Sequence, residues 1–540
     1  MNKMKAALSV IIAIVMIMSI SPLSFASNVG TTYYVDSVNG DDGNSGTSAD
    51  SAWKTVEKAS SVEYSAGDKI LFKAGDSFVG QFDAKGSGTE ENPITLGAYG
   101  DVEKLGKPAL TVNDDKAVIR IVDLSYWTID GLDISAPNGM GIFVSCEKSE
   151  MRGITIENCS IHDIFQCRVE SQAVFWHASI AIWTIGAGHL RDVTIRNIDI
   201  KDCGYGIYIT GNSAENANGY FVSPEESYLK NLLCENLSIN NVFYDGIIIS
   251  SVYNSTVRNC KIINASLYDD FATAPIWMSH SKKVTVEHCE IAGSTNTKDG
   301  MAIDFDGWVT DSTVQYVYSH DNVRFMQNCV YDDETQNRNN TVRYCLSVND
   351  NKALNNAAQL LGGKNATVGM TNFKFYNNTI IDGGDYDFSN LVDATIANNV
   401  FISSKAVGKI QVTRKNSIAG VHKFDGVMTN NCFINYTIPM AAKNNTMAYA
   451  GFVGGDLYDI NSYILSASSP LIGKGIQVEE NMGEQDYYGN PLGNTHNIGC
   501  FDSQGIGDGK KIDPFVKIKA VLAPILFKFF GAVHYLFDRL

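Results

Sequence analysis

A short pattern recurs along the middle of the chain and constrains its fold more than any other feature. Two β-branched or apolar residues precede a polar residue that is often Asn, then a small or apolar residue and usually an Ile, as in WTIDGLDI at 127–134 and ITIENCSI at 154–161. The residue after the Asn-like position marks each copy: Leu132, Cys159, Ile198, Leu237, Cys260, Cys289, Val317, Cys345, Asn378, Asn399 and Cys432. Successive markers lie 21 to 39 residues apart. Such a period predicts a solenoid, because one unit cannot bury its apolar face alone and must stack on its neighbours.

Each repeat is typical of two or three short strands. Apolar and polar residues alternate with period two, Val, Ile and Thr are abundant, and a second apolar run follows many markers, as in GIYIT at 206–210 and GIIIS at 246–250. Asn, Gly, Asp and Ser separate the runs, as turns require. No LxxLxL or WD-type signature is present. The pattern therefore favours an all-β chain folded as a parallel β-helix.

The domain organisation follows from the solenoid. A solenoid core grows along one axis, so 540 residues with 44% hydrophobic content can form one long domain. We expect a single β-helix over 27–505, with an N-terminal module and cap at 27–115, central rungs at 116–440 and a closing module at 441–505.

The two ends of the sequence differ from the rest. Lys3 and Lys5 precede an apolar run over 6–20, and Ser24-Phe25-Ala26 offers a small-x-small cleavage site. This pattern predicts a bacterial signal peptide at 1–26 and a secreted, extracellular protein. Residues 506–540 are predicted to form an amphipathic tail. Its apolar, slightly basic part at 515–540 could cap the solenoid, dock a protein or lie on a membrane surface.

The eleven cysteines are not arranged as a disulfide framework. Cys159, Cys260, Cys289, Cys345 and Cys432 share one repeat position with Ile, Leu and Val. We therefore expect buried, mostly free thiols stacked inside the solenoid. No CxxC metal spacing is present.

The charge balance limits the partners. A formal net charge of −17 argues against nucleic acid and anionic membranes. It would also repel a polyanion such as pectin unless Ca²⁺ or a local basic patch intervened, and a neutral glycan is easier to accommodate. The acidic loop at 36–46 is interpreted as a cap that could bind Ca²⁺. No other cofactor is indicated, the metal ligands stay unknown, and we expect a monomer.

The densest polar cluster spans 299–351. In DGMAIDFDG, the alternation places Asp304 and Asp306 on one strand face, away from Met301, Ile303 and Phe305, with Cα atoms ~6.5–7 Å apart. Polar residues recur on the next two rungs: Asp299 before this strand, His320, Asp321 and Asn322 on the following rung, and Arg343, Asn349 and Asp350 on the one after. We expect these groups to converge on one side wall.

Clustered carboxyls suit glycosidic cleavage. One carboxyl must stay protonated as the acid while another acts as base or nucleophile, and neighbouring carboxyls push each other's pKa values apart. The alternative is that Asp, Asn and His only cap turns or hold a structural Ca²⁺. Two like charges on one strand face are unfavourable for the fold, so the presence of both Asp304 and Asp306 favours a functional role for them.

Aromatic residues near the cluster suggest sugar platforms, because pyranose C–H faces pack on aromatic rings. Trp277, His280 and Trp308 lie close to the carboxyls in sequence, and Trp176, His177 and Trp183 share one long insertion. Ordinary packing under a loop is the alternative for each of them.

The chain resembles the right-handed parallel β-helix proteins of bacterial carbohydrate degradation, in their pectate-lyase-like group. The residues that carry the resemblance are YYVDSVNGDDGNSGTSADSAWKTVEKAS and AGDKILFKAGDSF within 33–78, and SSPLIGKG, DYYGNP and NIGCFD within 468–502. DGMAIDFDG, YSHDN and VRYCLSVND resemble the central motif of a glycoside hydrolase-like branch. The similarity covers about 31–502 and implies the fold more specifically than the activity, since lyases, hydrolases and epimerases share it. The sequence departs from that branch at 316–318 and 323–325, where Arg324 could fill a subsite.

These observations predict a secreted glycan-degrading enzyme, a glycoside hydrolase of plant cell-wall or similar polysaccharide. Asp304 and Asp306 are the predicted catalytic carboxyls, completed by Asp321 or Asp299 and oriented by His320. The substrate-binding candidates are Trp277, His280, Trp308, Asn322, Arg324, Arg343, Asn349 and Asp350. A Ca²⁺-dependent polysaccharide lyase is one alternative, with Lys298, Arg324 or Arg343 as its base. A non-catalytic adhesin or structural β-helix is the other.

Overall fold

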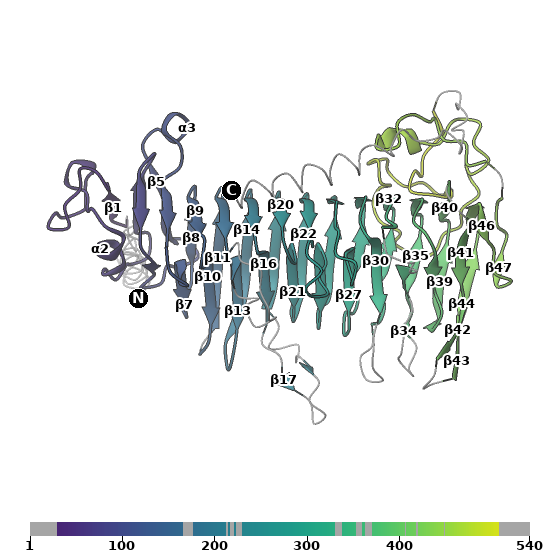
Figure 1. The fold of residues 1–540 in the computed structure, drawn as a ribbon, viewed down its shortest axis with the longest axis horizontal. Helices are drawn as coiled ribbons and strands as arrows, with labels where there is room; N and C mark the ends of the chain where they lie inside the picture. Colours follow the sequence, from purple (N-terminus) through teal and green to yellow (C-terminus); the bar gives the residue numbers. More distant parts are fainter. Residues whose placement is uncertain are drawn as a thin grey trace, which may run out of the picture.

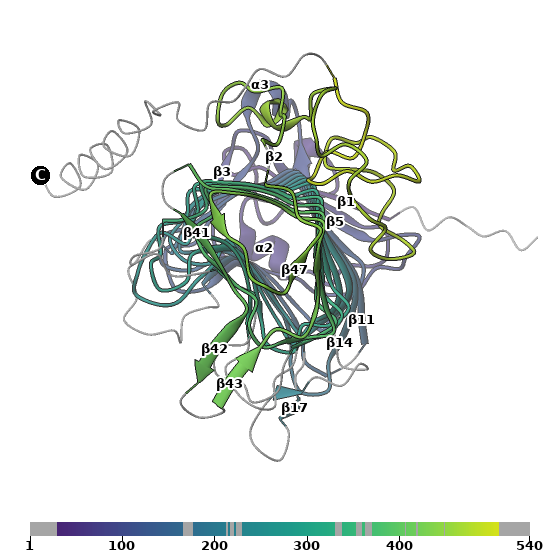
Figure 2. The same cartoon turned by 90° about the vertical axis from the view of Figure 1, so that its right-hand side faces the viewer.

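The computed structural model describes residues 30–506, except 149, 166–176, 212–213, 216–220, 223–228, 330–336, 353–358, 362–369, 405–406, 417–419 and 448. Within that part the chain winds into one long solenoid of parallel strands (Figure 1). Each rung visits three walls in the same order, and the end-on view shows the walls enclosing a common interior (Figure 2). The predicted signal peptide, Trp176 and nearly all of the predicted tail lie outside the described residues.

The first wall is a 15-stranded sheet. Its strands are β1 (Thr32–Val35), β2 (Lys69–Lys73), β5 (Ile94–Tyr99), β8 (Trp127–Asp130), β11 (Glu150–Glu157), β14 (His189–Arg196), β19 (Leu229–Glu235), β22 (Val252–Arg258), β25 (Lys282–Glu287), β28 (Thr313–Gln315), β31 (Thr341–Arg343), β35 (Lys374–Tyr376), β39 (Ala394–Ala397), β44 (Gly426–Thr429) and β47 (Ala442–Lys443).

The second wall is a 13-stranded sheet. Its strands are β3 (Ser77–Val79), β6 (Ala109–Thr111), β9 (Asp133–Ala136), β12 (Ser160–Ile164), β15 (Asp199–Cys203), β20 (Ser238–Val242), β23 (Lys261–Ala265), β26 (Glu290–Ala292), β29 (Tyr318–His320), β32 (Leu346–Val348), β36 (Thr379–Ile381), β40 (Val400–Ile402) and β45 (Cys432–Ile434).

The third wall is a nine-stranded sheet followed by a separate four-stranded one. The nine strands are β4 (Phe82–Asp83), β7 (Ala117–Val122), β10 (Met140–Cys146), β13 (Ala178–Thr184), β16 (Tyr205–Thr210), β21 (Ile247–Ser250), β24 (Ile276–Ser279), β27 (Met301–Asp306) and β30 (Arg324–Cys329). The four are β33 (Gln359–Leu360), β37 (Tyr386–Asp387), β41 (Gly408–Gln411) and β46 (Tyr436–Thr437).

The remaining elements are short. Two-stranded pairs are formed by β34 (Met370–Thr371) with β38 (Leu391–Val392), by β17 (Ala214–Glu215) with β18 (Phe221–Val222), and by β42 (Thr413–Asn416) with β43 (Gly420–Lys423). The helices are α2 (Val56–Ser60), α3 (Val102–Leu105) and the 3₁₀ turns η1 (Ala49–Ser51) and η4 (Ile460–Tyr463). None of the helices in the described part of the chain is long and apolar enough to cross a membrane.

The Asn-like position of the repeat is the bend between the first and second walls. Asn158, Asn197 and Asn236 there adopt φ of +55°, +55° and +54°, a conformation that Asn tolerates better than most residues. Their amides hydrogen-bond from rung to rung, with Nδ2 of Asn197 donating to Oδ1 of Asn158 at 3.1 Å. The repeating polar residue therefore both turns the chain and links successive rungs.

The marker residues after this bend point into the solenoid, as predicted. Leu132, Cys159, Ile198 and Cys345 are at most 1% exposed. The prediction is wrong for Cys432. Asn430 (φ +52°) makes the bend of that rung, so Asn431 takes the marker position and hydrogen-bonds the backbone N–H of Asn399 at 2.9 Å.

The described cysteines behave as expected. The nine for which the structure gives a thiol environment are free and buried: Cys146, Cys159, Cys203, Cys234, Cys260, Cys289, Cys345, Cys432 and Cys500. Burial raises the pKa of the Cys159 and Cys345 thiols to about 12, which keeps them protonated and unreactive at neutral pH.

The two ends of the solenoid are treated differently. At the N-terminal end, Val56 and Ala59 of α2 join the interior core, and Figure 2 shows α2 across that end. Near the other end, the closing segment (residues 449–506) folds back as loops beside the last rungs (Figure 1). Phe452, Leu465 and Ile498 of this segment pack against Val348 and Val400 on the outside of the second wall.

Candidate active site

An outward row of side chains crosses the third wall. The strand register pairs Tyr208 with Ile248, Ile248 with Trp277, Trp277 with Asp304 and Asp304 with Gln327. Period-two alternation in β27 turns Ile303 and Phe305 into the core, where both are fully buried. Asp304 and Asp306 therefore share the outer face, as the sequence predicts.

These two carboxyls have different surroundings. Asp304 is 1% exposed, and its Oδ1 accepts a hydrogen bond of 3.2 Å from Nε2 of Gln327. This burial differs from the open position expected for an outward strand residue, because neighbouring side chains cover it. Asp306 is half-buried, and its Oδ2 accepts a hydrogen bond of 3.3 Å from Nε1 of Trp277. One carboxyl is thus enclosed while the other stays accessible beside an indole ring.

Two further carboxyls lie at the start of third-wall strands. Asp299 lies in the turn before β27, and the guanidinium of Arg324 donates to its backbone carbonyl at 3.0 Å. Asp245 precedes β21, is 4% exposed, and accepts a hydrogen bond of 2.8 Å from the backbone N–H of Ala274. Asp245 was missed in the sequence, where it stands alone between Tyr244 and Gly246.

The turn that carries Asp299 is held by one buried amide. Oδ1 of Asn296 accepts the backbone N–H groups of Lys298 and Asp299 at 2.9 and 3.2 Å. Its Nδ2 donates to the carbonyl of Phe271 on the preceding rung at 2.6 Å. Gly300 follows with φ +62°, and a Cβ there would lie 2.2 Å from the carbonyl oxygen of Asn296. The chain can therefore enter β27 this tightly only with glycine at 300.

Burial and mutual repulsion raise the pKa values of two of these carboxyls. Burial, reinforced by the charges of Asp306 and Asp299, raises the pKa of Asp304 well above its usual range. Burial, with a smaller contribution from Asp299, raises the pKa of Asp245 to about 8. These shifts favour the neutral form of Asp304 and Asp245, and a neutral carboxyl can donate a proton or a hydrogen bond.

Aromatic rings line the same wall on the side toward the N-terminus. The ring of Trp183 packs edge-on against Phe143 and Tyr208, with centroids 5.5 and 6.0 Å apart. Tyr205 stacks on Tyr244 at 4.8 Å. Tyr205 and Tyr244 belong to an apolar cluster outside the solenoid that includes Ile248, and the half-buried Trp277 packs against it. The wall beside the carboxyls is therefore aromatic.

His280 and Trp308 lie in the turns that leave β24 and β27, both with positive φ (+50° and +57°). The backbone N–H of His280 donates to Gly307 at 3.0 Å, which places the two turns on adjacent rungs. Nε1 of Trp308 is buried and has no hydrogen-bond partner within the described part of the chain. Both residues therefore lie at the edge of the third wall where β24 and β27 end.

The predicted convergence with the two following rungs is wrong. His320 ends β29 on the second wall, and Asp321 follows it at the corner between the second and third walls. Asn322 and Asp350 are fully buried and bond each other, the Asn322 N–H donating to Asp350 at 2.9 Å. Asn349 donates from Nδ2 to Asp321. These four polar residues around His320 stabilise the corner instead of lining the third wall.

Arg343 is also misplaced by the sequence prediction. It ends β31 on the first wall, where its Nη1 donates to the hydroxyl of Tyr376 at 3.0 Å and to the carbonyl of Asn481 at 2.9 Å. Glu479 lies 3.5 Å from the same nitrogen. Arg343 therefore attaches the closing segment to the solenoid.

The His320–Asp321 pair attaches the closing segment to the second wall. Nδ1 of His320 lies 3.2 Å from Asp321 and its Nε2 3.5 Å from Glu290. Tyr458 of the closing segment donates to Asp321 at 3.1 Å. Burial opposes the imidazolium charge, but the hydrogen bonds with Asp321 and Glu290 outweigh it and raise the pKa of His320 to about 9. The hydrogen bond from His320, with help from Lys261, lowers the pKa of Glu290 to about 2.

This arrangement predicts a pH-dependent loss of stability for His320→Ala. A histidine whose folded pKa is raised stabilises the fold fully below its ordinary value of 6.5, and the contribution disappears as pH rises through about 9. The variant should therefore lose more thermal stability at pH 6 than at pH 9.5. Parallel melting curves at both pH values measure this, with His189→Ala on the first wall as control. An equal loss at both pH values would contradict the ion-pair account.

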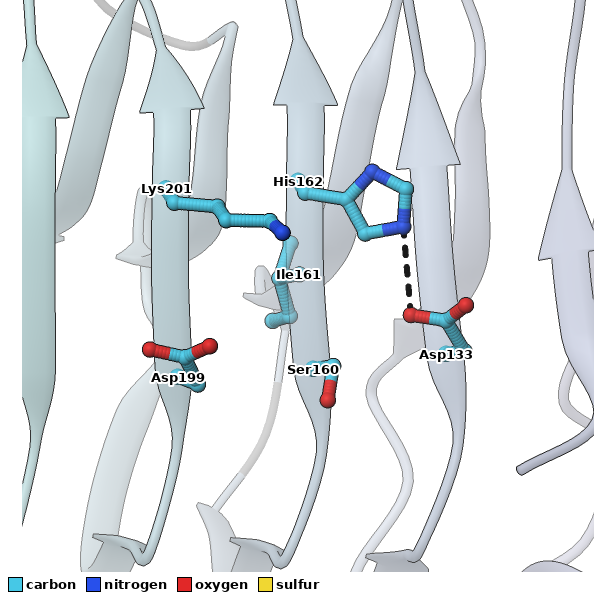
Figure 3. Close-up of a pocket in the computed structure, with 6 residues that line it drawn as sticks. All are labelled: Asp133, Ser160, Ile161, His162, Asp199 and Lys201. Carbon is cyan, nitrogen blue, oxygen red and sulfur yellow. Dashed lines mark ion pairs between the residues drawn. The ribbon is translucent and has the colours of Figure 1, made fainter. Parts of the chain in front are cut away.

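A separate polar pocket lies on the second wall. Asp133, Ser160, His162, Asp199 and Lys201 from β9, β12 and β15 line a shallow cavity of about 190 Å³ (Figure 3). His162 lies between carboxyls, 3.2 Å from Asp133 and 2.6 Å from Asp163. This pocket is on a different wall from Asp304, and no Trp, Tyr or Phe is among the residues that line it.

The Asp36 and Asp42 carboxyls of the loop at 36–46, considered for metal binding, are engaged by backbone and side-chain groups of the protein. In the loop at 36–46, Asp36 accepts the N–H of Asn39 at 2.7 Å and pairs with Lys73 at 2.6 Å. Asp42 accepts the hydroxyl of Thr55 at 2.8 Å. Among the described residues, no group of three or more His, Cys, Asp or Glu side chains is placed to hold a metal ion.

Comparison with known proteins supports the fold. Residues 178–380 match the family described as "Right handed beta helix region". XylC, solved in complex with xylose, superposes with a TM-score of 0.50 over 88% of this chain and 99% of its own, at 12% identity. The protein is therefore a right-handed parallel β-helix, and the predicted fold class and resemblance are confirmed.

Two lacto-N-biosidases are similar in sequence or structure. The enzyme of Bifidobacterium longum subsp. longum is 24% identical over 513 residues, covering 75% of this chain. The chain spans only 31% of the length of that relative. The crystal structure of a GH136 lacto-N-biosidase from Eubacterium ramulus gives a TM-score of 0.48 at 18% identity, over 77% of this chain and 67% of that one.

Proposed function

We propose that this protein hydrolyses glycosidic bonds of an oligosaccharide or polysaccharide on its third wall. The single observation that carries the proposal is the pair on β27, with an enclosed Asp304, whose pKa burial raises, next to a more accessible Asp306. Hydrolysis of a glycoside needs one protonated and one ionised carboxyl. The lacto-N-biosidase similarity and the aromatic wall beside the pair support the same reaction class.

The geometry gives each carboxyl a role. Asp304 donates the proton to the leaving oxygen, because burial raises its pKa and so favours the protonated form. Asp306 acts at the anomeric carbon, directly or through water, since it is the more accessible of the two and Trp277 orients it. Alternate positions of one strand hold Cα atoms ~6.5–7 Å apart, which allows either the retaining or the inverting carboxyl separation.

The lyase alternative has less support from the positions of the basic residues. Nζ of Lys298 donates to the carbonyl of Asp270 at 2.7 Å, and Arg324 donates to the carbonyl of Asp299. Arg343 lies on the first wall under the closing segment. The three candidate bases are thus engaged by backbone carbonyls, whereas the carboxyls are gathered on the outer face.

Secretion remains part of the proposal and follows from residues 1–26 alone. The substrate is tested with a panel that includes a chromogenic lacto-N-bioside, neutral plant cell-wall polysaccharides and polyuronides. Hydrolysis predicts new reducing ends without absorbance near 235 nm. Unsaturated uronide products would identify a lyase, and no product from any glycan would support the adhesin alternative.

Because Asp304 is buried, replacing it by Asn is expected to remove the catalytic acid and yet to stabilise the fold at pH 8. A carboxyl whose folded pKa is raised leaves the fold most stable below its ordinary pKa of 3.8, and that stability is lost as pH rises through the folded pKa. Asp304→Asn cannot ionise, so it should melt at a higher temperature than wild type at pH 8 and at nearly the same temperature at pH 4. Asp199→Asn, exposed on the second wall, is the control. A lower melting temperature at pH 8 would contradict the buried neutral state.

A further inference from the structure

The C-terminal end of the solenoid exposes apolar side chains. In the described part of the chain, β46 is the last strand of the third wall and β47 the last strand of the first wall, and Figure 2 looks onto this end. A solenoid end stays soluble when its outer face is polar. Here Val407 and Met447 are 65% and 74% exposed, and Met440 is fully exposed. This end therefore leaves apolar surface in water, whereas α2 covers the other end.

An open groove of about 410 Å³ lies on the third wall at the same end. β41, β46 and the turn after β46 form it, and its apolar lining residues are Ile410, Val412, Ile438, Pro439, Met440 and Ala441. β46 pairs with β41 on one side, and no strand of the described chain pairs with its other edge. The groove thus combines an apolar surface with an open strand edge, which are two features that bind further polypeptide.

The described chain ends near the rungs that carry this groove. The backbone N–H of Ile506 donates to the carbonyl of Leu465 at 3.0 Å. Leu465 belongs to the closing segment and shares an apolar cluster with Val400 of β40 and Cys432 of β45. Along the chain, β41 follows β40 and β46 follows β45. The chain therefore leaves the closing segment beside the same two rungs whose third-wall strands line the groove.

The segment beyond residue 506 has the length and composition to occupy the groove. Residues 507–514 can span at most ~29 Å, and they lead to the apolar part at 515–540, whose charged residues are Lys517, Lys519, Lys528, Asp538 and Arg539. This part is basic, whereas the whole chain has a formal net charge of −17, so charge also favours its binding to the solenoid. A tethered segment meets a site within its reach at an effective concentration on the order of millimolar.

We propose that residues 515–540 bind the groove of their own chain and cap the C-terminal end of the solenoid. Apolar side chains of both partners leave water on binding, which provides the driving force. The tether favours this occupant over a separate one, because a second copy of the chain or a membrane surface must be captured from solution. The inference is independent of the proposed function, since the groove does not include the carboxyl pair of β27.

The test measures maleimide labelling of Met440→Cys in the full chain, with and without Phe527→Asp and Phe530→Asp in the tail. The bound tail should slow labelling at position 440 by roughly 10-fold or more. The two tail substitutions should restore fast labelling, because an apolar groove disfavours a carboxylate. Peptide mass spectrometry separates this position from the native thiols. Val38→Cys, 69% exposed near the N-terminal end, is the control and should react equally fast with either tail.

Three results would overturn the proposal. Labelling at position 440 could be equally fast with both tails, which would leave the groove without this occupant. Protection that disappears on dilution of the protein would assign the groove to a second copy of the chain. Protection that appears only with anionic phospholipid vesicles would assign the tail to a membrane surface. Ala441→Cys, at an exposed position that also lines the groove, repeats each measurement should Met440→Cys fail to fold.

Discussion

Replacing Asp306 by Asn is expected to lower glycan hydrolysis by roughly 10²-fold or more while leaving the fold intact. Asp306 is half-buried, and its Oδ2 accepts a hydrogen bond from Nε1 of Trp277. An amide oxygen can accept the same bond, so the side chain stays in place. The ionised carboxylate needed at the anomeric carbon is lost, and groups that do such work contribute about 10²–10⁴-fold.

The matched control is Asp199→Asn, the same substitution at an outward strand position of the second wall. It lines the pocket of Figure 3, so it also tests the alternative site there. Rates for both variants are measured on the substrate that the panel identifies. A near-wild-type rate for Asp306→Asn together with a loss for Asp199→Asn would move the active site to the second wall.

Replacing Phe305 by Ala is expected to destabilise the solenoid by about 3–5 kcal/mol, the range for truncating a buried aromatic side chain. Phe305 is fully buried between Asp304 and Asp306 in sequence but on the opposite face of β27. Its register neighbours are Met278 and Asn328 on the adjacent rungs. The substitution thus opens a cavity behind the carboxyl pair.

Urea unfolding of the full chain measures this effect, with Phe305→Leu as the control that fills most of the space. The midpoint should fall in the order wild type, Leu, Ala. If Phe305→Ala unfolds at the wild-type midpoint, the assignment of inner and outer faces in β27 is wrong, and with it the outward position of Asp304 and Asp306.

The repeat itself was readable in the sequence because the same local requirement recurs in every rung. A bend with positive φ needs Asn or a similar residue, as at Asn158 and Asn197, and the following residue must fit the interior. The register failed only at 430–431, where the local pattern does not say which Asn makes the bend, although the Asn pairs at 377–378 and 398–399 were assigned correctly. Cys432 was assigned to the interior column for this reason.

The grouping of polar residues into one site was much harder to predict. The alternation with period two predicts on which face of a strand a side chain lies, but not the wall to which the strand belongs. Residues from three different walls were therefore assigned to one cluster. Arg343 and Glu479, which meet at the closing segment, are 136 residues apart. Asp245 is brought toward Asp304 only by the stacking of rungs. Neither of these spatial relations leaves a signal in the local sequence.

The most direct test of the account is hydrolysis of the identified substrate in H₂¹⁸O, followed by mass spectrometry of the products. The account predicts one ¹⁸O atom at the new reducing end for each bond cleaved, and loss of this incorporation in Asp306→Asn. Products that carry a double bond and no ¹⁸O, or equal incorporation by wild type and Asp306→Asn, would contradict hydrolysis by the third-wall carboxyls.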